Sequence, residues 1–264
     1  MAFETLLVER EGAVVTVTLN RPKQLNAINR TMVRELDELA AGLEVEPPGD
    51  GGARVVVFTG AGDRAFLAGA DISEFQGLTP IEALSFGQRI QRLYSRIEAL
   101  PQVTIAAVNG FALGGGCELT QACDLVLAAE GARFGQPEVN LGVIPGAGGT
   151  QRLARLVGLH RAKELNFLGE MIDAPEAYRI GLVNRVVSAD RLMAEARALA
   201  EKLLAKSPLT LRMIKEAMNE GYDLDLPKGL AIEAKAWAVA FSTEDRAEGV
   251  AAFLGKRKAA FKGR

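Results

Sequence analysis

Apolar and polar residues alternate over Val14–Leu19 ("VVTVTL"), which predicts a strand, with 6–9 as its partner across a glycine turn. Residues 30–44 carry apolar side chains at helical spacing, and the segment 46–52 ("EPPGDGG") is rich in residues that end helices. The continuous apolar run in 54–60 ("RVVVFTG") then predicts a buried strand. The chain therefore begins with strands and a helix in alternation.

The alternation continues through the middle of the chain. Helical spacing over 80–100 stops at Pro101, and "VTIAAV" (Val103–Val108) predicts the next strand. Three glycines, Gly114–Gly116, then precede a predicted helix from Gly115 and a strand over 124–129. Strand and helix units that keep returning to a sheet predict an α/β core over 1–190.

After residue 190 the pattern becomes helical throughout. Helices are expected near 190–205, 208–220, 228–241 and 243–258, punctuated by prolines and by "STED", a capping-box start. The sequence predicts a helical domain over 191–264, and a second copy of the chain is one candidate to cover its apolar face.

Composition narrows the class of protein. In 264 residues, 48% are hydrophobic, 24% are charged and the net charge is −2, so no broad basic face favours nucleic acid or an anionic membrane. No apolar run reaches the roughly 20 residues of a membrane span, and the N-terminus lacks a signal-peptide pattern. Cys117 and Cys123 do not face each other on one helix, which argues against a disulfide. A cytoplasmic protein without membrane or nucleic-acid partners is expected.

The C-terminal segment "GKRKAAFKGR" departs from this charge balance, since it holds five basic residues and no acid. Two interpretations stay open: a solvated helix end and a local anion site.

The residue types restrict the chemistry. The single histidine, His160, follows a glycine at a helix start without a readable partner, and is interpreted as structural. Neither a nucleophile elbow nor a metal-ligand pair occurs, so acid–base chemistry would rest on carboxylates. Glu118 ("GGGCEL") and Glu138 ("FGQPEV") stand among glycine, proline and apolar residues, where burial would raise a carboxylate pKa toward neutrality. An ordinary surface position is the alternative for each.

The glycine triplet strengthens the case for Glu118. A helix beginning at Gly114 or Gly115 exposes first-turn N–H groups, and Glu118 lies three residues after Gly115 on the same face. Glycine lets a ligand oxygen approach the backbone, as an oxyanion hole beside a general base requires. The following strand is long enough to bring Glu138 back to the same place.

These residues belong to a longer pattern. The segment "AAVNGFALGGGCELTQACDLVLAAEGARFGQPEVNLGVIPGAGGTQRL" resembles the signature of the crotonase superfamily and, within it, enoyl-CoA hydratase. "VTLNRPKQLNAIN", "RAFLAGADISEF" and "STEDRAEGVAAFLGKRKAAFKG" extend the likeness over nearly the whole chain. The resemblance implies repeated ββα units in a crotonase core, a C-terminal helical trimerisation region, and homohexamers built as dimers of trimers.

The resemblance also implies the site. Glu118 and Glu138 would be the catalytic pair, and the N–H groups of Ala70 and Gly115 the oxyanion hole. The remaining residues expected to hold the acyl-CoA are Lys23, Leu25, Ala27, Ala68, Asp71, Ile72, Gly114, Lys258 and Phe261, the last two in a C-terminal region that often reaches CoA from a neighbouring subunit.

The implied reaction is reversible syn addition of water to trans-2-enoyl-CoA, giving 3-hydroxyacyl-CoA as in fatty acid β-oxidation. Glu118 would help activate the water for attack at C3, and Glu138 would deliver a proton to C2. No metal or redox cofactor is required, and coenzyme A belongs to the substrate. Leu67 stands where relatives often have a smaller residue, which leaves the acyl-chain preference open.

Other functions are weighed against this one. Isomerases of the same superfamily generally lack the first glutamate, whereas hydratases for branched or aromatic enoyl-CoA share the pair. A nicotinamide site at Gly60-x-Gly62-x-x-Ala65 would need a helix opening at those glycines, and "GDRAFLAGADISEF" has no helical periodicity. An RNA-binding protein is disfavoured by the charge balance.

Overall fold

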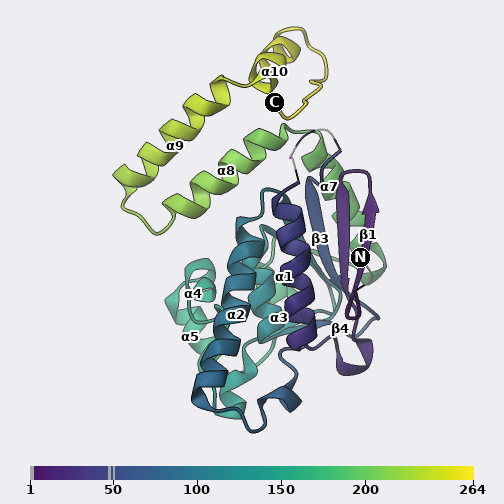
Figure 1. Cartoon of the computed structure of the whole chain (residues 1–264), viewed down its shortest axis with the longest axis vertical. Helices are drawn as coiled ribbons and strands as arrows, with labels where there is room; N and C mark the ends of the chain where they lie inside the picture. The colour runs from purple at the N-terminus through teal and green to yellow at the C-terminus, as the bar shows by residue number, and fades with distance from the viewer. Residues whose placement is uncertain (1–2, 47–48, 50) are drawn as a thin grey trace.

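The computed structural model describes residues 3–46, 49 and 51–264, so part of the breaker-rich segment 46–52 lies outside the described residues. The chain folds into an α/β body and a helical arm that projects from one end of it (Figure 1). The main sheet has the order β1-β2-β3-β5-β7-β10. Its strands are β1 (Leu6–Glu11), β2 (Val14–Leu19), β3 (Val55–Gly60), β5 (Val103–Val108), β7 (Leu125–Ala129) and β10 (Arg185–Val187).

The main sheet is parallel apart from the β1–β2 hairpin, whose register pairs Leu6 with Leu19. A smaller sheet has the order β4-β6-β8-β9. Its strands are β4 (Ala65–Leu67), β6 (Phe111–Leu113), β8 (Arg133–Gly135) and β9 (Ile172–Asp173). Parallel strands require crossover connections, and the helices that supply them cover the sheet.

The central strands are apolar along their whole length because both faces of the main sheet are covered. On β3, Val56 and Phe58 pack into the cluster that includes Leu36 and Leu93, whereas Val55 and Val57 pack on the other face with Leu192 and its neighbours. The first face is covered by α1 (Arg30–Glu44), α2 (Pro80–Ala99) and α3 (Gly115–Ala122), and the second by α7 (Leu192–Leu204).

Further helices lie beside the body and beyond it. Next to α2 lie α4 (Arg152–Val157) and α5 (Leu159–Leu168), and α6 (Ala174–Arg179) follows β9. The projecting arm consists of α8 (Pro208–Gly221), α9 (Leu226–Phe241) and α10 (Glu244–Leu254) (Figure 1). The first helix of the region predicted as a helical domain, α7, thus packs on the sheet, and the three that follow form the arm.

The end of the last helix corrects the sequence prediction. The helix expected to reach 258 ends at Leu254, because Lys256 adopts φ 51°, outside the helical range. The tail then folds back: the N–H groups of Lys262 and Gly263 donate to Asp245 at 2.6 and 3.0 Å, and Arg257 forms an ion pair with Glu248. The basic segment is therefore a folded extension and not a helix end.

Candidate active site

The start of α3 is held in an unusual backbone conformation. Gly114, directly before the helix, has φ 49° and ψ −119°, which favours glycine. A Cβ at Gly116 would overlap the carbonyl oxygen of Leu67, so glycine is needed for α3 to pack on β4. The buried Tyr94 of α2 donates its hydroxyl to the Gly115 carbonyl at 2.8 Å, which fixes the first turn.

Two backbone N–H groups meet beside this helix start. Gly115 is the first residue of α3, so its N–H has no acceptor within the helix. Ala70 and Ile28 form a parallel β-bridge. The Ile28 N–H donates to the Gly69 carbonyl and the Asp71 N–H donates to the Ile28 carbonyl, so the Ala70 N–H between them points away from Ile28. Among the described residues, neither N–H donates a hydrogen bond to protein. A Cβ on Gly115 would lie 4.0 Å from the carbonyl carbon of Gly69, to which the Ala70 nitrogen is bonded. The N–H donors of Gly115 and Ala70 are therefore neighbours.

Glu118 is buried one turn into α3. Its Oε1 accepts hydrogen bonds from the N–H groups of Ala147 and Gly149, at 2.7 and 2.8 Å. Burial raises the pKa of Glu118, while these two donors and the charge of Arg152 act in the opposite direction. The alternative of a surface glutamate is therefore wrong for Glu118.

Glu138 reaches the same place from the 3-10 helix η3 (Pro137–Leu141). Its Oε1 lies 2.8 Å from the position that a Cβ on Gly114 would occupy. Burial raises the pKa of this half-buried carboxyl to about 7, and the charge of Glu118 adds to the rise. The side-chain amide of the buried Gln136 is hydrogen-bonded when its nitrogen faces Glu138. That nitrogen then donates to both carboxylate oxygens of Glu138 at 3.2 Å.

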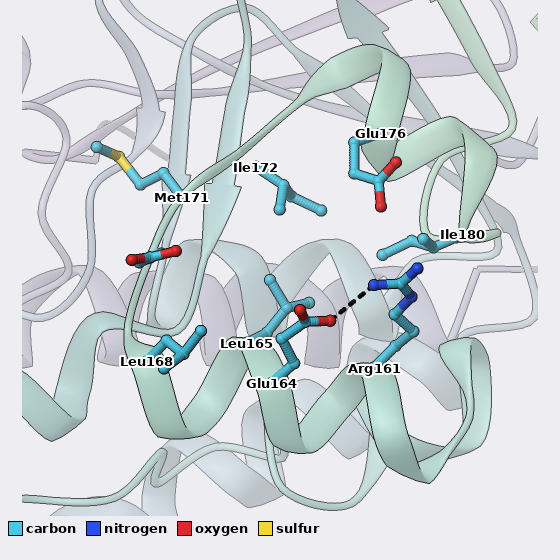
Figure 2. A pocket seen from close by; sticks show the side chains of 9 residues that line it. Arg161, Glu164, Leu165, Leu168, Met171, Ile172, Glu176 and Ile180 are labelled. Atoms are coloured by element: carbon cyan, nitrogen blue, oxygen red, sulfur yellow. Dashed lines mark hydrogen bonds and ion pairs between the residues drawn. The ribbon is translucent and has the colours of Figure 1, made fainter.

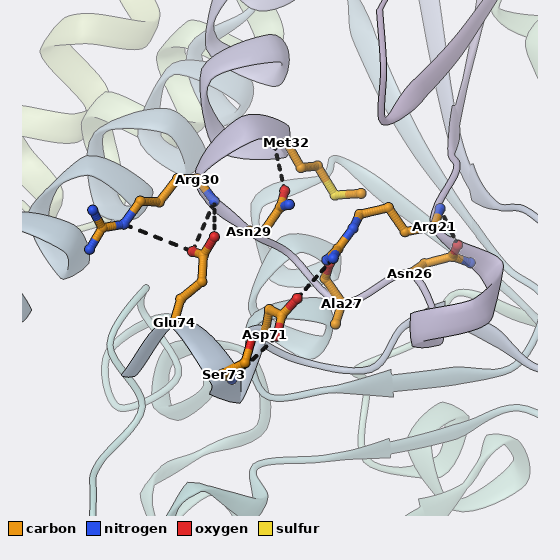
Figure 3. A network of polar contacts seen from close by, with 9 residues as sticks. All are labelled: Arg21, Asn26, Ala27, Asn29, Arg30, Met32, Asp71, Ser73 and Glu74. Atoms are coloured by element: carbon orange, nitrogen blue, oxygen red, sulfur yellow. Dashed lines mark hydrogen bonds and ion pairs between the residues drawn. The ribbon is translucent and has the colours of Figure 1, made fainter. Parts of the chain in front are cut away.

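The two loops predicted to hold the acyl-CoA are bonded to each other (Figure 3). Arg21 donates to the Ala27 carbonyl at 2.5 Å and forms an ion pair with Asp71 at 2.8 Å. A backbone hydrogen bond also joins the loops, since the Ala68 N–H donates to the Leu25 carbonyl at 3.1 Å. Hydrogen bonds from the Ser73 hydroxyl and from the Arg21 guanidinium hold the pKa of Asp71 below its usual value. The side chain of Asp71 thus braces the loops.

The other predicted contacts divide into two groups. The first group lies on the two bonded loops. In this group Lys23 and Ile72 are exposed, and the half-buried residues are Leu25, Ala27, Ala68 and Asp71. Lys258 and Phe261 lie on the C-terminal tail, where Phe261 packs over Gly249 of α10. Figure 1 shows that tail apart from α3, so the single chain does not bring it to Glu118.

Leu67 and His160 are also located by the structure. The Leu67 side chain is fully buried in the core. His160 is exposed near the start of α5. The glycines of "GAGDRA" lead into β4 and not into a helix, so the nicotinamide fingerprint lacks its helix.

Several residues that shape the site were missed from the sequence. The donors Ala147 and Gly149 come from "PGAGGTQR", whose glycine density was a signal for exposed backbone N–H groups. Tyr94 carried no local signal, because only the folded chain brings its hydroxyl to the Gly115 carbonyl, and the same holds for the pairing of Arg152 with Glu98. Gln136 directly precedes η3, but its contact with Glu138 is visible only in the structure.

A separate surface pocket of about 120 Å³ lies between α5, β9 and α6 (Figure 2). Its wall includes an exposed ion pair between Arg161 and Glu164 at 2.7 Å. None of the predicted site residues lines it. Across the described part of the chain, no three His, Cys, Asp or Glu residues gather as a metal site, and no helix has the length and apolarity to span a membrane.

Comparison with known proteins identifies the family. Residues 9–264 match the model of the enoyl-CoA hydratase/isomerase family. A crotonyl-CoA hydratase of Syntrophomonas wolfei is 46% identical, with 99% of both chains covered. A short-chain-enoyl-CoA hydratase of Clostridium acetobutylicum is also 46% identical, covering 98% of this chain and 97% of the other.

Solved structures agree with the sequence relatives. The crystal structure of an enoyl-CoA hydratase from Bacillus anthracis superposes with a TM-score of 0.94 at 42% identity, covering 99% of this chain and 100% of that one. The crotonase fold and the enoyl-CoA hydratase class, a hydro-lyase, are thereby confirmed. The chain belongs to the enoyl-CoA hydratase/isomerase family.

Proposed function

We propose that the protein adds water reversibly, in syn fashion, to trans-2-enoyl-CoA thioesters, and that Glu118 and Glu138 act on one water. A single observation carries this proposal. Two carboxylates with raised pKa values border the helix start at which the Gly115 and Ala70 N–H groups have no acceptor among the residues that the structure describes. A nucleophilic water, a proton donor and an oxyanion site are what addition to a conjugated thioester requires.

The surroundings of the two glutamates support different roles. Glu118 receives two backbone N–H donors and lies near Arg152, which favours its ionised form. Glu138 has a pKa of about 7, so a large fraction is protonated at neutral pH. In hydration, Glu118 accepts a proton of the water whose oxygen bonds to C3, and Glu138 gives its proton to C2. The proton gained by Glu118 then returns to Glu138, which restores both carboxyl groups for the next turnover.

The N–H groups of Ala70 and Gly115 stabilise the thioester oxygen as it becomes an enolate oxygen. Removal of one such donor typically costs about 10²–10³ in rate. The positive end of α3 adds to this field. Gly114 leaves room for Glu138 beside the same oxygen.

Binding of CoA is assigned to the loops 21–27 and 68–72, joined by Arg21 and Asp71. The functional assembly is a homohexamer, a dimer of trimers, in which Lys258 and Phe261 contact CoA held by a neighbouring subunit. Apolar side chains exposed along the arm, including Met218, Leu226 and Trp237, support burial of the arm against other copies. No metal or redox cofactor takes part, and the protein works in the cytoplasm.

The test is the loss of conjugated thioester absorbance of crotonyl-CoA. Wild-type protein is expected to be active without added metal or nicotinamide, and product analysis should give 3-hydroxybutyryl-CoA. Double-bond migration in a 3-enoyl-CoA without hydration of crotonyl-CoA would instead indicate an isomerase. Activity only on branched or aromatic enoyl-CoA would indicate a specialised hydratase. Dependence on NAD would overturn the proposal.

A further inference from the structure

Arg152 of α4 touches the loop that holds Glu118. Its Nη1 donates to the Ala147 carbonyl at 3.0 Å, and the N–H of the same Ala147 donates to Glu118 Oε1 at 2.7 Å. One residue thus connects the guanidinium to the carboxylate without direct contact between their side chains.

The guanidinium is itself fixed from the opposite side. Its Nε and Nη2 donate to Glu98 Oε2 at 3.2 and 2.7 Å, and Nη2 also to the Ser95 hydroxyl at 3.1 Å. Only 16% of the Arg152 side chain is exposed. A Cβ on Gly148, which has φ 130°, would lie 2.5 Å from Nη1. Glycine there lets the guanidinium pack against the loop.

The ionisable groups around Glu118 come from a few elements. They are Tyr94 from α2, Arg152 from α4, Glu138 from η3 and Cys117 from α3 itself, and β4 and β6 supply none. Arg152 is the cation of this group, and it forms an ion pair with Glu98 of α2. Its charge opposes the rise that burial imposes on the pKa of Glu118.

We propose that Arg152 is a positioning residue for hydration: it fixes Glu118 through the loop 147–149 and places a positive charge near that carboxylate. The inference rests on the proposed role of Glu118 as the base. It assigns to Arg152 no contact with substrate or water.

The test is the pH dependence of kcat/KM for crotonyl-CoA in the full-length protein, with thermal unfolding recorded alongside. In Arg152→Met, the acid limb should move upward by about one pH unit, since a nearby opposite charge lowers a carboxyl pKa by one to three. At pH 7, kcat should fall about 10²-fold because the base is misplaced, with KM within twofold. Arg152→Lys keeps the charge without the guanidinium fork, so its acid limb should stay near wild type while kcat falls.

Arg155→Met is the matched control, because Arg155 lies on the same helix, is exposed, and pairs with Asp223 at 2.9 Å. It should leave both kcat and the acid limb unchanged. An unmoved acid limb in Arg152→Met would overturn the inference even if the rate falls. An equal shift in the Lys variant or in Arg155→Met would also overturn it. If Arg152→Met does not fold, Arg152→Lys provides the test. Because lysine keeps the positive charge, an acid limb of the Lys variant that moves upward by about one pH unit would contradict a role of the charge. Inactive wild-type protein would instead defeat the proposed function.

Discussion

Glu138 lies against the backbone of Gly114, with its Oε1 2.8 Å from where a Cβ on that glycine would stand. The residue that begins the turn into α3 thus also sets the space available to the second carboxylate. The helix start, the proposed oxyanion donors and the proposed proton donor are therefore coupled through one glycine.

Gly114→Ala is expected to lower kcat by about 10²-fold, because the new methyl group displaces Glu138 and the backbone resists the conformation at Gly114. Steady-state kinetics with crotonyl-CoA measure the effect. Gly131→Ala is the control, since a Cβ there meets no atom within 4 Å. Equal kinetics in the two variants would contradict the coupling.

Replacement of either glutamate by its amide should reduce kcat by about 10²–10⁴-fold, the contribution typical of a general acid or base. Glu118→Gln keeps the shape that accepts the Ala147 and Gly149 N–H groups, so the fold should persist. Circular dichroism and crotonyl-CoA turnover are the measurements. Wild-type turnover in both variants would eliminate the two-glutamate mechanism.

The hydration rate should fall above neutral pH. Glu138 is the proposed proton donor, and its pKa of about 7 means that the protonated form is lost as pH rises through that value. The alkaline limb of kcat/KM for hydration should therefore lie near pH 7. That for dehydration should lie at the same pH, because the equilibrium constant of the reaction, which does not depend on pH, fixes the ratio of the two. A hydration profile flat from pH 6 to 9 would argue against Glu138 as the donor.

The same pKa predicts a stability cost. The folded pKa of Glu138, about 7, lies above the ordinary glutamate value of 4.5, so the folded state is progressively destabilised as pH rises from 4.5 to 7. Glu138→Gln should therefore be more stable than wild type at pH 8, by about 1–2 kcal/mol after allowance for partial exposure, and equal near pH 4. Urea unfolding at the two pH values tests this. A variant less stable at pH 8 would refute it.

The loop brace should affect binding more than chemistry. Arg21→Met removes the ion pair to Asp71 and the bond to the Ala27 carbonyl, so we expect KM to rise about tenfold with kcat little changed. Arg30→Met is the control, because Arg30 reaches Glu74 only at 4.0 Å and its side chain is exposed (Figure 3). A change confined to kcat would assign Arg21 to the chemistry.

Much of this protein follows from its sequence. Alternation located β2, an apolar run located β5 and helical spacing located α1, because residues buried on one or both faces of an element recur with the period of that element. The glycines before Glu118 predicted a helix start with free N–H groups for the same local reason. Family motifs added the pairing with Glu138 and the expected roles.

Other features required the tertiary structure. Tyr94 reaches the Gly115 carbonyl from α2, and Arg152 is held by Glu98 of α2, and no local pattern marks a side chain whose partner is distant in sequence. The helix ends at Leu254 because Lys256 leaves the helical conformation, and the tail beyond it returns to Asp245, a contact that helical periodicity does not encode. The sequence thus determined the two carboxylates and the helix start, and the fold decided their protonation, since a pKa depends on every charge and donor packed around the group.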